Sequence, residues 1–183
     1  MMTSSNLQQL ISPEQIQTRV MELSEAISHD YTGQPLTLIG VMTGSLMFLA
    51  DLVRHLRIPH QIGVVQASSY PGASTSSGPL RIECGFLPPV ADRDLLIVDD
   101  ILDTGKTLSA LKQQLLTMQP ASVNTAVLLW KQSRTEHFPA PDYFGFQIQD
   151  RFVVGYGLDY DDDFRHLNAI YEFQETPNPG DAK

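Results

Sequence analysis

The feature that most constrains the fold is the alternation of short apolar runs with segments of helical periodicity. The runs LTLIGVM at 36–42, LLIV at 95–98 and NTAVLLW at 124–130 are almost continuously apolar, as expected of strands covered on both faces. Between these runs, residues 46–57 and the positions Leu108, Leu111, Leu115 and Met118 predict helices. Strands that alternate with helices predict an α/β fold with a mainly parallel, twisted sheet flanked by helices.

The remaining segments extend this pattern at both ends. Residues 61–67, the alternating run 80–86 and the runs YFGFQI and FVVGYGL predict further strands. Ser12, Pro13 and Gln15 form a capping-box pattern before apolar positions at helical spacing. A chain of 183 residues suits one domain. We expect a core over about 36–150, a small hood from about 1–33 and 151–175, and a disordered tail at 176–183.

Charge and cysteine content exclude several classes of protein. The formal net charge is −9 and no basic run occurs, which argues against a nucleic-acid partner. Cys84 is the single cysteine, so no intramolecular disulfide and no cysteine cluster for zinc can form. The N-terminal segment lacks a cationic and apolar leader, and the most apolar window is broken by polar residues. We therefore expect a cytoplasmic protein without a membrane partner.

A low-complexity segment, SSYPGASTSSGP, occupies residues 68–79. It could be a simple connector. A loop of this length within a compact domain more often closes over a binding site. The segment is therefore predicted to be a lid.

The stretch LLIVDDILDTGKT at residues 95–107 has the properties of an anion site. It follows a predicted strand and leads into a predicted helix, whose first backbone N–H groups favour an anion. Gly105 allows close approach of the backbone, and Thr104 and Thr107 add hydroxyl donors. A P-loop is excluded because Asp100 stands where its first glycine should be. The Asp-Thr-Gly triplet of an aspartic protease is unsuited to an α/β chain.

The carboxylates Asp99, Asp100 and Asp103 indicate that the ligand is more than a phosphate. A sugar phosphate presents hydroxyl groups, and carboxylates accept hydrogen bonds from hydroxyl donors. Any Mg²⁺ carried by the ligand also prefers oxygen ligands. Nearby anions further stabilise a cationic transition state. Together these carboxylates predict a phosphorylated ribose that reacts through a cationic carbon.

Five stretches carry a family resemblance. LLIVDDILDTGKTL resembles the 5-phosphoribosyl-1-pyrophosphate (PRPP) motif of the type I phosphoribosyltransferases, whose fold is Rossmann-like. MTGS, SSYPGASTSSG, LLWKQSR and DRFVVGYGLDYDDDFRHL resemble the pyrophosphate loop, mobile loop, purine-binding lysine segment and base-stacking segment of the 6-oxopurine salvage enzymes. These stretches span residues 36–170 in the expected order. They identify the chain as similar to the hypoxanthine-guanine phosphoribosyltransferases.

The resemblance implies a role for each matching position. Asp99 and Asp100 would bind the ribose hydroxyls, and Asp103 would lie near N7 of the purine and act as general base or share its proton. The 5′-phosphate would be bound by Asp103, Thr104, Gly105, Lys106 and Thr107, and pyrophosphate by Thr43, Gly44, Ser45 and Arg165, across a cis peptide after Met42. The purine would be bound by Lys131, Phe152, Val153 and Asp159, with Ser69 and Tyr70 in the mobile loop. Asp159, Asp99 and Asp100 would be the residues nearest Mg²⁺.

The implied reaction is Mg²⁺-dependent transfer of 5-phosphoribosyl from PRPP to N9 of hypoxanthine or guanine, by a homodimer or homotetramer. Two alternatives remain open: a non-catalytic regulatory protein of the same fold that binds PRPP or a nucleotide, and a transferase that prefers xanthine. The chain departs from the family at two positions. Thr43 stands where many members carry lysine, and Asp99 stands where glutamate is common.

Overall fold

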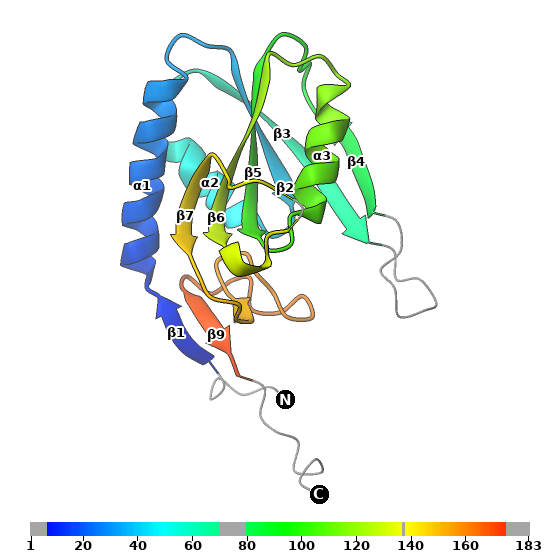
Figure 1. Cartoon of the computed structure of the whole chain (residues 1–183). Coiled ribbons are helices and arrows are strands. Elements are labelled where there is room, and N and C mark those ends of the chain that lie inside the picture. Colours follow the sequence, from blue (N-terminus) through cyan, green and yellow to red (C-terminus); the bar gives the residue numbers. More distant parts are fainter. Residues whose placement is uncertain (1–6, 70–79, 137, 175–183) are drawn as a thin grey trace, which may run out of the picture.

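A computed structural model describes residues 7–69, 80–136 and 138–174. Figure 1 shows a large sheet flanked by helices and a smaller sheet beneath the arrowheads of β5, β6 and β7. The strands are β1 (Leu7–Ile11), β2 (Leu36–Met42), β3 (His60–Ser69), β4 (Leu80–Phe86), β5 (Asp94–Leu102), β6 (Ser122–Trp130), β7 (Tyr143–Gln147), β8 (Val153–Val154) and β9 (Ile170–Phe173). The helices are α1 (Pro13–Asp30), α2 (Leu46–His55), α3 (Lys106–Leu116) and the 3₁₀ helix Gln132–Arg134.

The large sheet has the strand order β4-β3-β2-β5-β6-β7. Every neighbouring pair from β3 to β7 is parallel, and only the edge strand β4 runs antiparallel to its neighbour. The order reverses at β2, which lies between β3 and β5, so the carboxyl ends of β2 and β5 meet at a switch point. The prediction of a mainly parallel α/β sheet is confirmed.

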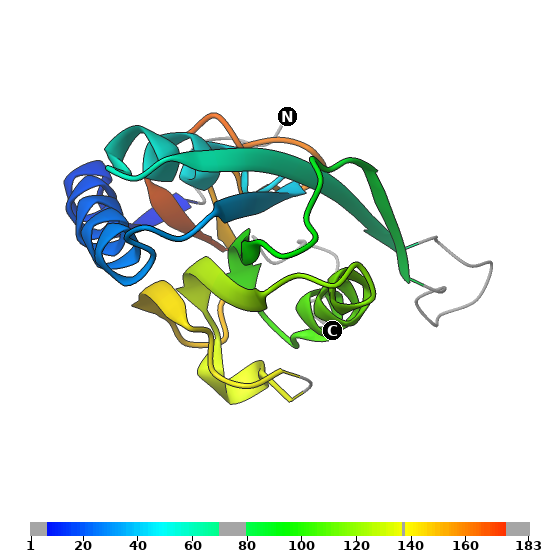
Figure 2. The same cartoon turned by 90° about the horizontal axis from the view of Figure 1, so that it is seen from above.

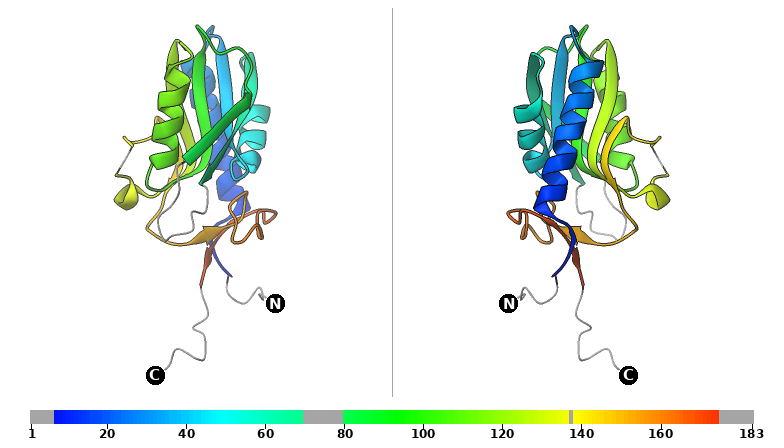
Figure 3. Two further views of the ribbon diagram at one scale, coloured as in Figure 1. Left: turned by 90° about the vertical axis from the view of Figure 1, so that its right-hand side faces the viewer. Right: turned by 90° about the vertical axis from the view of Figure 1, so that its left-hand side faces the viewer.

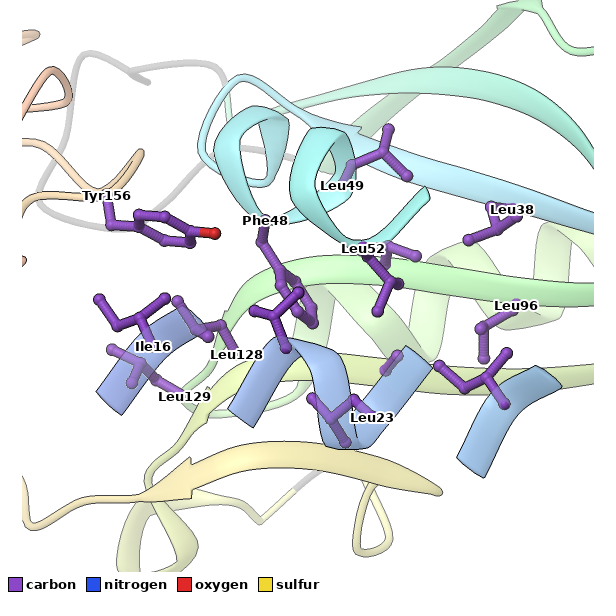
Figure 4. Close-up of a cluster of buried hydrophobic side chains, with 14 of the residues drawn as sticks. Ile16, Leu23, Leu38, Phe48, Leu49, Leu52, Leu96, Leu128, Leu129 and Tyr156 are labelled. Atoms are coloured by element: carbon purple, nitrogen blue, oxygen red, sulfur yellow. The ribbon is translucent and has the colours of Figure 1, made fainter. Parts of the chain in front are cut away.

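Each face of the large sheet is covered by helices because its central strands are apolar on both sides. Leu96 and Val98 of β5 pack in one cluster with α1 and α2, whereas Leu95 and Ile97 pack in a second cluster with α3. Figures 2 and 3 show α1 and α2 on one side of the sheet and α3 on the other. Figure 4 shows the first cluster, in which Phe48 of α2 is fully buried. Each buried leucine stabilises this sandwich by about 1.5–3 kcal/mol.

The N-terminus of α1 has the capping box that the sequence predicts. The Ser12 hydroxyl accepts a hydrogen bond from the Gln15 amide at 3.3 Å, and the Gln15 side chain accepts one from the Ser12 amide at 2.8 Å. The buried face of α1 contacts α2 and β7. Helix α1 therefore packs on the large sheet. The predicted hood includes all of about 1–33, and thus this helix as well.

The small sheet has the order β1-β9-β8 and joins both terminal segments. Its last strand, β8, is limited to Val153–Val154, although the run FVVGYGL predicts a longer strand. The reason is that Gly155, Tyr156 and Gly157 have φ values of 98°, 50° and 102°, which no strand accommodates. The chain after β8 therefore turns back toward the large sheet.

Three further boundaries differ from the predicted ones. Helix α2 ends at His55, because Leu56 adopts an extended conformation three residues before Pro59. Strand β5 continues through Asp99 and Asp100 to Leu102, so these carboxylates lie within the strand and not after it. Helix α3 starts at Lys106, since Gly105 before it is left-handed. In the part of the chain that the structure describes, no helix has the length and apolar character needed to span a membrane.

Candidate active site

A cavity of about 370 Å³ lies at the switch point, where the carboxyl ends of β2 and β5 meet the start of α3. Its lining includes Thr43 and Gly44, the run from Asp99 to Leu108, and Asp159 and Arg165 from the segment after β8. Three parts of the chain that are distant in sequence therefore surround one space. The sequence predicts a ligand site where the strand of the PRPP motif leads into a helix, and the cavity lies at that place.

The turn before α3 is shaped to bind an anion through its backbone. Gly105 has a φ of 82°, in the left-handed region where only glycine is unstrained. A Cβ at this position would also overlap Phe138. The amides of Lys106 and Thr107 lie in the first turn of α3, where no intrahelical acceptor exists for them. The helix dipole adds to their attraction for a phosphate.

Two carboxylates lie beside this turn in different environments. Asp99 is 7% exposed, and its carboxylate accepts a hydrogen bond from the Asp100 amide at 3.0 Å. Burial, followed by the neighbouring charge of Asp100, raises the pKa of Asp99 well above its ordinary value. Burial also raises the pKa of Asp100, which accepts from the Ile101 amide at 2.8 Å. Ligands that bring hydroxyl donors or positive charge would relieve the cost of ionising this pair.

The predicted pyrophosphate loop follows β2, and its Met42–Thr43 peptide bond is cis, as the resemblance implies. Thr43 and Gly44 line the cavity, whereas Ser45 does not. Ser45 is fully buried at the N-cap of α2, and its hydroxyl has no hydrogen-bond partner among the residues that the structure describes. The expected contact through Ser45 is therefore not available to its side chain in this arrangement.

Arg165 reaches the cavity from the segment after β8. Its Nη1 donates to the Gly157 carbonyl at 2.9 Å, and its Nη2 lies 2.9 Å from Asp159 Oδ1 and 3.0 Å from Asp162 Oδ1. Gly157 in turn lies directly against the Gly44 carbonyl, because a Cβ on Gly157 would overlap that oxygen. Arg165, Asp159 and the pyrophosphate loop are thus held together by the hood.

Lys131 follows β6, and its side chain is 9% exposed. Its Nζ lies 3.2 Å from Asp150 Oδ1 and 3.8 Å from Asp103 Oδ2. Arg134 contacts both of the same carboxylates: its Nε lies 2.7 Å from Asp103 Oδ1 and its Nη1 lies 3.1 Å from Asp150 Oδ2. The Arg134 hydrogen bond lowers the pKa of Asp150. Sequence reasoning missed Arg134 and Asp150, although both occur in the stretches that carry the resemblance.

Phe152, Val153 and Lys131 do not line the cavity itself. The Phe152 ring is 49% exposed and packs edge-on against Tyr160 and Phe173, with centroid distances of 5.6 and 6.0 Å. Val153 is only 5% exposed, so its side chain is buried. An exposed aromatic face that is supported by other aromatics is suited to stacking with a planar ring.

Most of the predicted mobile loop, residues 70–79, lies outside the described residues. Ser69 is the last residue of β3, and Tyr70 lies outside the described residues.

A possible metal site can be judged from donor chemistry. Asp99, Asp100 and Asp159 line the same cavity and supply only oxygen donors, which fit Mg²⁺. Within residues 7–69, 80–136 and 138–174, no group of three or more His, Cys, Asp or Glu side chains is close enough to hold a metal alone.

Comparison with known proteins places this site in a family. Residues 8–161 match the phosphoribosyl transferase domain. The chain is 41% identical over 167 residues to hypoxanthine-guanine phosphoribosyltransferase of Mycobacterium tuberculosis, a match that covers 88% of this chain and 83% of that protein. It is 37% identical over 163 residues to hypoxanthine phosphoribosyltransferase of Escherichia coli, which covers 88% of this chain and 92% of that protein.

A solved structure gives the same result. The crystal structure of a hypoxanthine phosphoribosyltransferase from Staphylococcus aureus aligns with a TM-score of 0.86 and 35% identity, over 92% of each chain. Residues 8–161, which match the family model, include the turn before α3 and Lys131. The chain therefore belongs to the phosphoribosyltransferase family, and within it to the hypoxanthine-guanine phosphoribosyltransferases.

Proposed function

We propose that the protein transfers the 5-phosphoribosyl group of PRPP to N9 of hypoxanthine or guanine, forming IMP or GMP and releasing pyrophosphate. The observation that carries this proposal is the joint lining of one cavity by the carboxylates Asp99 and Asp100, the anion-binding turn before α3 and the loop at Thr43. A phosphorylated sugar with two further phosphates needs all three elements at once.

The ribose phosphate occupies the β5–α3 side of the cavity in this proposal. Backbone amides of residues 104–107 bind the 5′-phosphate, and Asp99 and Asp100 accept hydrogen bonds from the ribose hydroxyls. Thr43, Gly44 and Arg165 contact the pyrophosphate group. Because Thr43 carries no charge, Arg165 is the main cationic side chain available to the leaving group among the lining residues near the loop.

The purine occupies the side of the site near Lys131. Lys131 donates to O6 of the base, which favours a 6-oxopurine because the exocyclic amine of adenine offers no equivalent acceptor. Phe152 stacks on the ring, and the Val153 backbone meets the pyrimidine edge. Asp103 lies near N7 and accepts or shares the purine proton as the bond from N9 to C1′ forms and the bond from C1′ to the pyrophosphate oxygen breaks.

Mg²⁺ bound with PRPP supplies charge neutralisation on the leaving pyrophosphate. Asp99, Asp100 and Asp159 are the residues that would face such an ion. The enclosed carboxylates also stabilise the oxocarbenium-like carbon that develops at C1′. We further propose a cytoplasmic location. We also propose a homodimeric or homotetrameric assembly, and sedimentation of the purified protein would test that assembly.

Product analysis after incubation with PRPP, Mg²⁺ and single bases tests the proposal. We expect IMP from hypoxanthine and GMP from guanine, each with equimolar pyrophosphate, and no product from adenine. Binding of PRPP without any nucleotide product would contradict the proposal and favour a regulatory protein. A kcat/KM higher for xanthine than for hypoxanthine and guanine would instead assign the enzyme to the xanthine-preferring class.

A further inference from the structure

Four charged side chains form a closed ring next to the base side of the site. In order around the ring they are Lys131, Asp103, Arg134 and Asp150, so each cation lies between two anions. The contacts measure 3.8 Å from Lys131 to Asp103, 2.7 Å from Asp103 to Arg134, 3.1 Å from Arg134 to Asp150 and 3.2 Å from Asp150 to Lys131. The ring as a whole carries no net charge.

The widest contact in the ring is the one between Lys131 and Asp103. The Lys131 amide donates to the Leu102 carbonyl at 2.9 Å, and the Thr135 hydroxyl donates to the Asp103 carbonyl at 2.9 Å. These bonds hold the two backbones side by side, within reach of a direct ion pair. Instead, each of the two side chains has a closer partner of opposite charge, Asp150 for Lys131 and Arg134 for Asp103.

Arg134 makes the shortest contact in the ring. Its Nε lies 2.7 Å from Asp103 Oδ1. Arg134 Nη1 donates to Asp150 at 3.1 Å. Arg134 is therefore anchored on Asp150 and presents its charge to Asp103.

The proposed reaction needs Lys131 and Asp103 as separate groups. Lys131 must present a free N–H to O6 of the purine, and Asp103 must present a free lone pair near N7. A direct pair between them would occupy both. We propose that Arg134 and Asp150 are positioning residues, which hold Lys131 and Asp103 apart by supplying each with a counter-charge on the side away from the purine. This inference rests on the proposed function, since it assigns how the purine half of that site is kept open.

Asp150 also connects the ring to the stacking platform. It lies between β7 and β8, two residues before Phe152, and the Ile148 amide in the same segment donates to the Trp130 carbonyl at 2.9 Å. The ion pairs of Asp150 therefore join the segment that carries Phe152 to the end of β6. Loss of Asp150 is expected to affect purine binding more than PRPP binding.

Steady-state kinetics of Asp150→Asn and Arg134→Gln test the proposal. Asp150→Asn frees Lys131, which then moves toward Asp103. Arg134→Gln frees Asp103, which then moves toward Lys131. In either variant, Lys131 and Asp103 pair directly. We expect the KM for hypoxanthine to rise up to about fivefold and kcat to fall, which corresponds to the loss of one half-exposed ionic contact. The KM for PRPP should change by less than about twofold, because neither Arg134 nor Asp150 lines the cavity proposed for PRPP.

Matched controls separate this effect from a general loss of charge. Arg54→Gln removes an exposed arginine that pairs with Asp51 on α2, and Asp92→Asn changes an exposed carboxylate in the turn before β5. Both controls should retain the hypoxanthine KM of the unmodified protein. Arg134→Lys should recover only part of the loss, since an ammonium cannot contact both carboxylates as the guanidinium does.

Epistasis gives the decisive readout. If Asp150 acts mainly through Lys131, then adding Asp150→Asn to Lys131→Ala should reduce kcat/KM for hypoxanthine much less than Asp150→Asn does in the unmodified protein. A multiplicative loss in the double variant, or a hypoxanthine KM in Asp150→Asn and Arg134→Gln equal to that of the controls, would overturn the inference. An unmodified protein that forms no IMP would instead contradict the proposed function itself, so the two failures are distinguishable.

Discussion

Gly44 and Asp100 pack so closely that a Cβ at position 44 would overlap the Asp100 carboxylate. This contact joins the end of β2 to the middle of the PRPP motif. On its other side, the Gly44 carbonyl is in contact with Gly157 of the hood. The predicted pyrophosphate loop is therefore confined between Asp100 and the segment that follows β8.

The first prediction follows from this confinement. Gly44→Ala should raise the KM for PRPP about tenfold or more, because the added methyl group must displace either Asp100 or the loop. The KM for hypoxanthine should change less, since the base side does not involve Gly44. Gly85→Ala is the matched control, because a Cβ at Gly85 meets no atom within 4 Å. Equal PRPP KM values for the two variants would refute the steric argument.

The second prediction concerns the stability that is lost by burying Asp99. Its folded pKa is raised above the ordinary value, so the folded state holds more protons than the unfolded state between these two pKa values. Stability therefore falls as the pH rises through that window. Asp99→Asn removes this loss and should raise Tm at neutral pH, by about 2–4 °C for each kcal/mol recovered.

The same variant should lose catalytic efficiency, because the neutral amide is a weaker acceptor for a ribose hydroxyl. The gain in Tm should shrink below about pH 4, where the carboxyl group is protonated in both states. Thermal melts from about pH 3 to pH 8 check this, with Asp92→Asn as an exposed control. A Tm difference that is independent of pH would count against the electrostatic origin.

The third prediction concerns the aromatic face at Phe152. Phe152→Ala should raise the hypoxanthine KM about tenfold, as expected for the loss of base–aromatic stacking worth about 1–3 kcal/mol. Stability should fall only modestly, because the side chain is 49% exposed. Phe86→Ala is a suitable comparison, since Phe86 is 81% exposed and lies on the edge strand β4. A hypoxanthine KM that is unchanged in Phe152→Ala would exclude the stacking role.

The fourth prediction concerns magnesium. Among the described residues, no three His, Cys, Asp or Glu side chains lie close enough together to hold a metal, so Mg²⁺ should bind with PRPP and not to the protein alone. Calorimetric titration with Mg²⁺ should therefore give no measurable binding until PRPP is added. EDTA should abolish turnover, and excess Mg²⁺ should restore it. Tight binding of Mg²⁺ to the protein without PRPP would contradict this assignment.

The elements that local sequence determines were predicted well. The capping box at Ser12 depends on residues within one helical turn, and the apolar runs of β2, β5 and β6 reflect burial on both faces. The end of β8 was not predictable in the same way. Tyr156 has a positive φ, which tertiary contacts impose on a residue that would ordinarily avoid it.

The site shows the same division between local and long-range information. The contiguous run from Asp99 to Thr107 lies together at the cavity because neighbours in sequence are neighbours in space. Arg134 and Asp150 are separated by the whole of β7, and nothing in their local sequence shows that they meet. Their pairing depends on the turn at the end of β6 and on the path from β7 to the hood.

The most direct test of the central claim is the initial rate of IMP formation from PRPP and hypoxanthine, measured in the unmodified protein and in Asp103→Ala and Lys131→Ala. We expect IMP with equimolar pyrophosphate from the unmodified protein. We also expect a loss of turnover in Asp103→Ala and a loss of oxopurine affinity in Lys131→Ala. The absence of IMP from the unmodified protein, or an unchanged kcat/KM in both variants, would contradict the central claim.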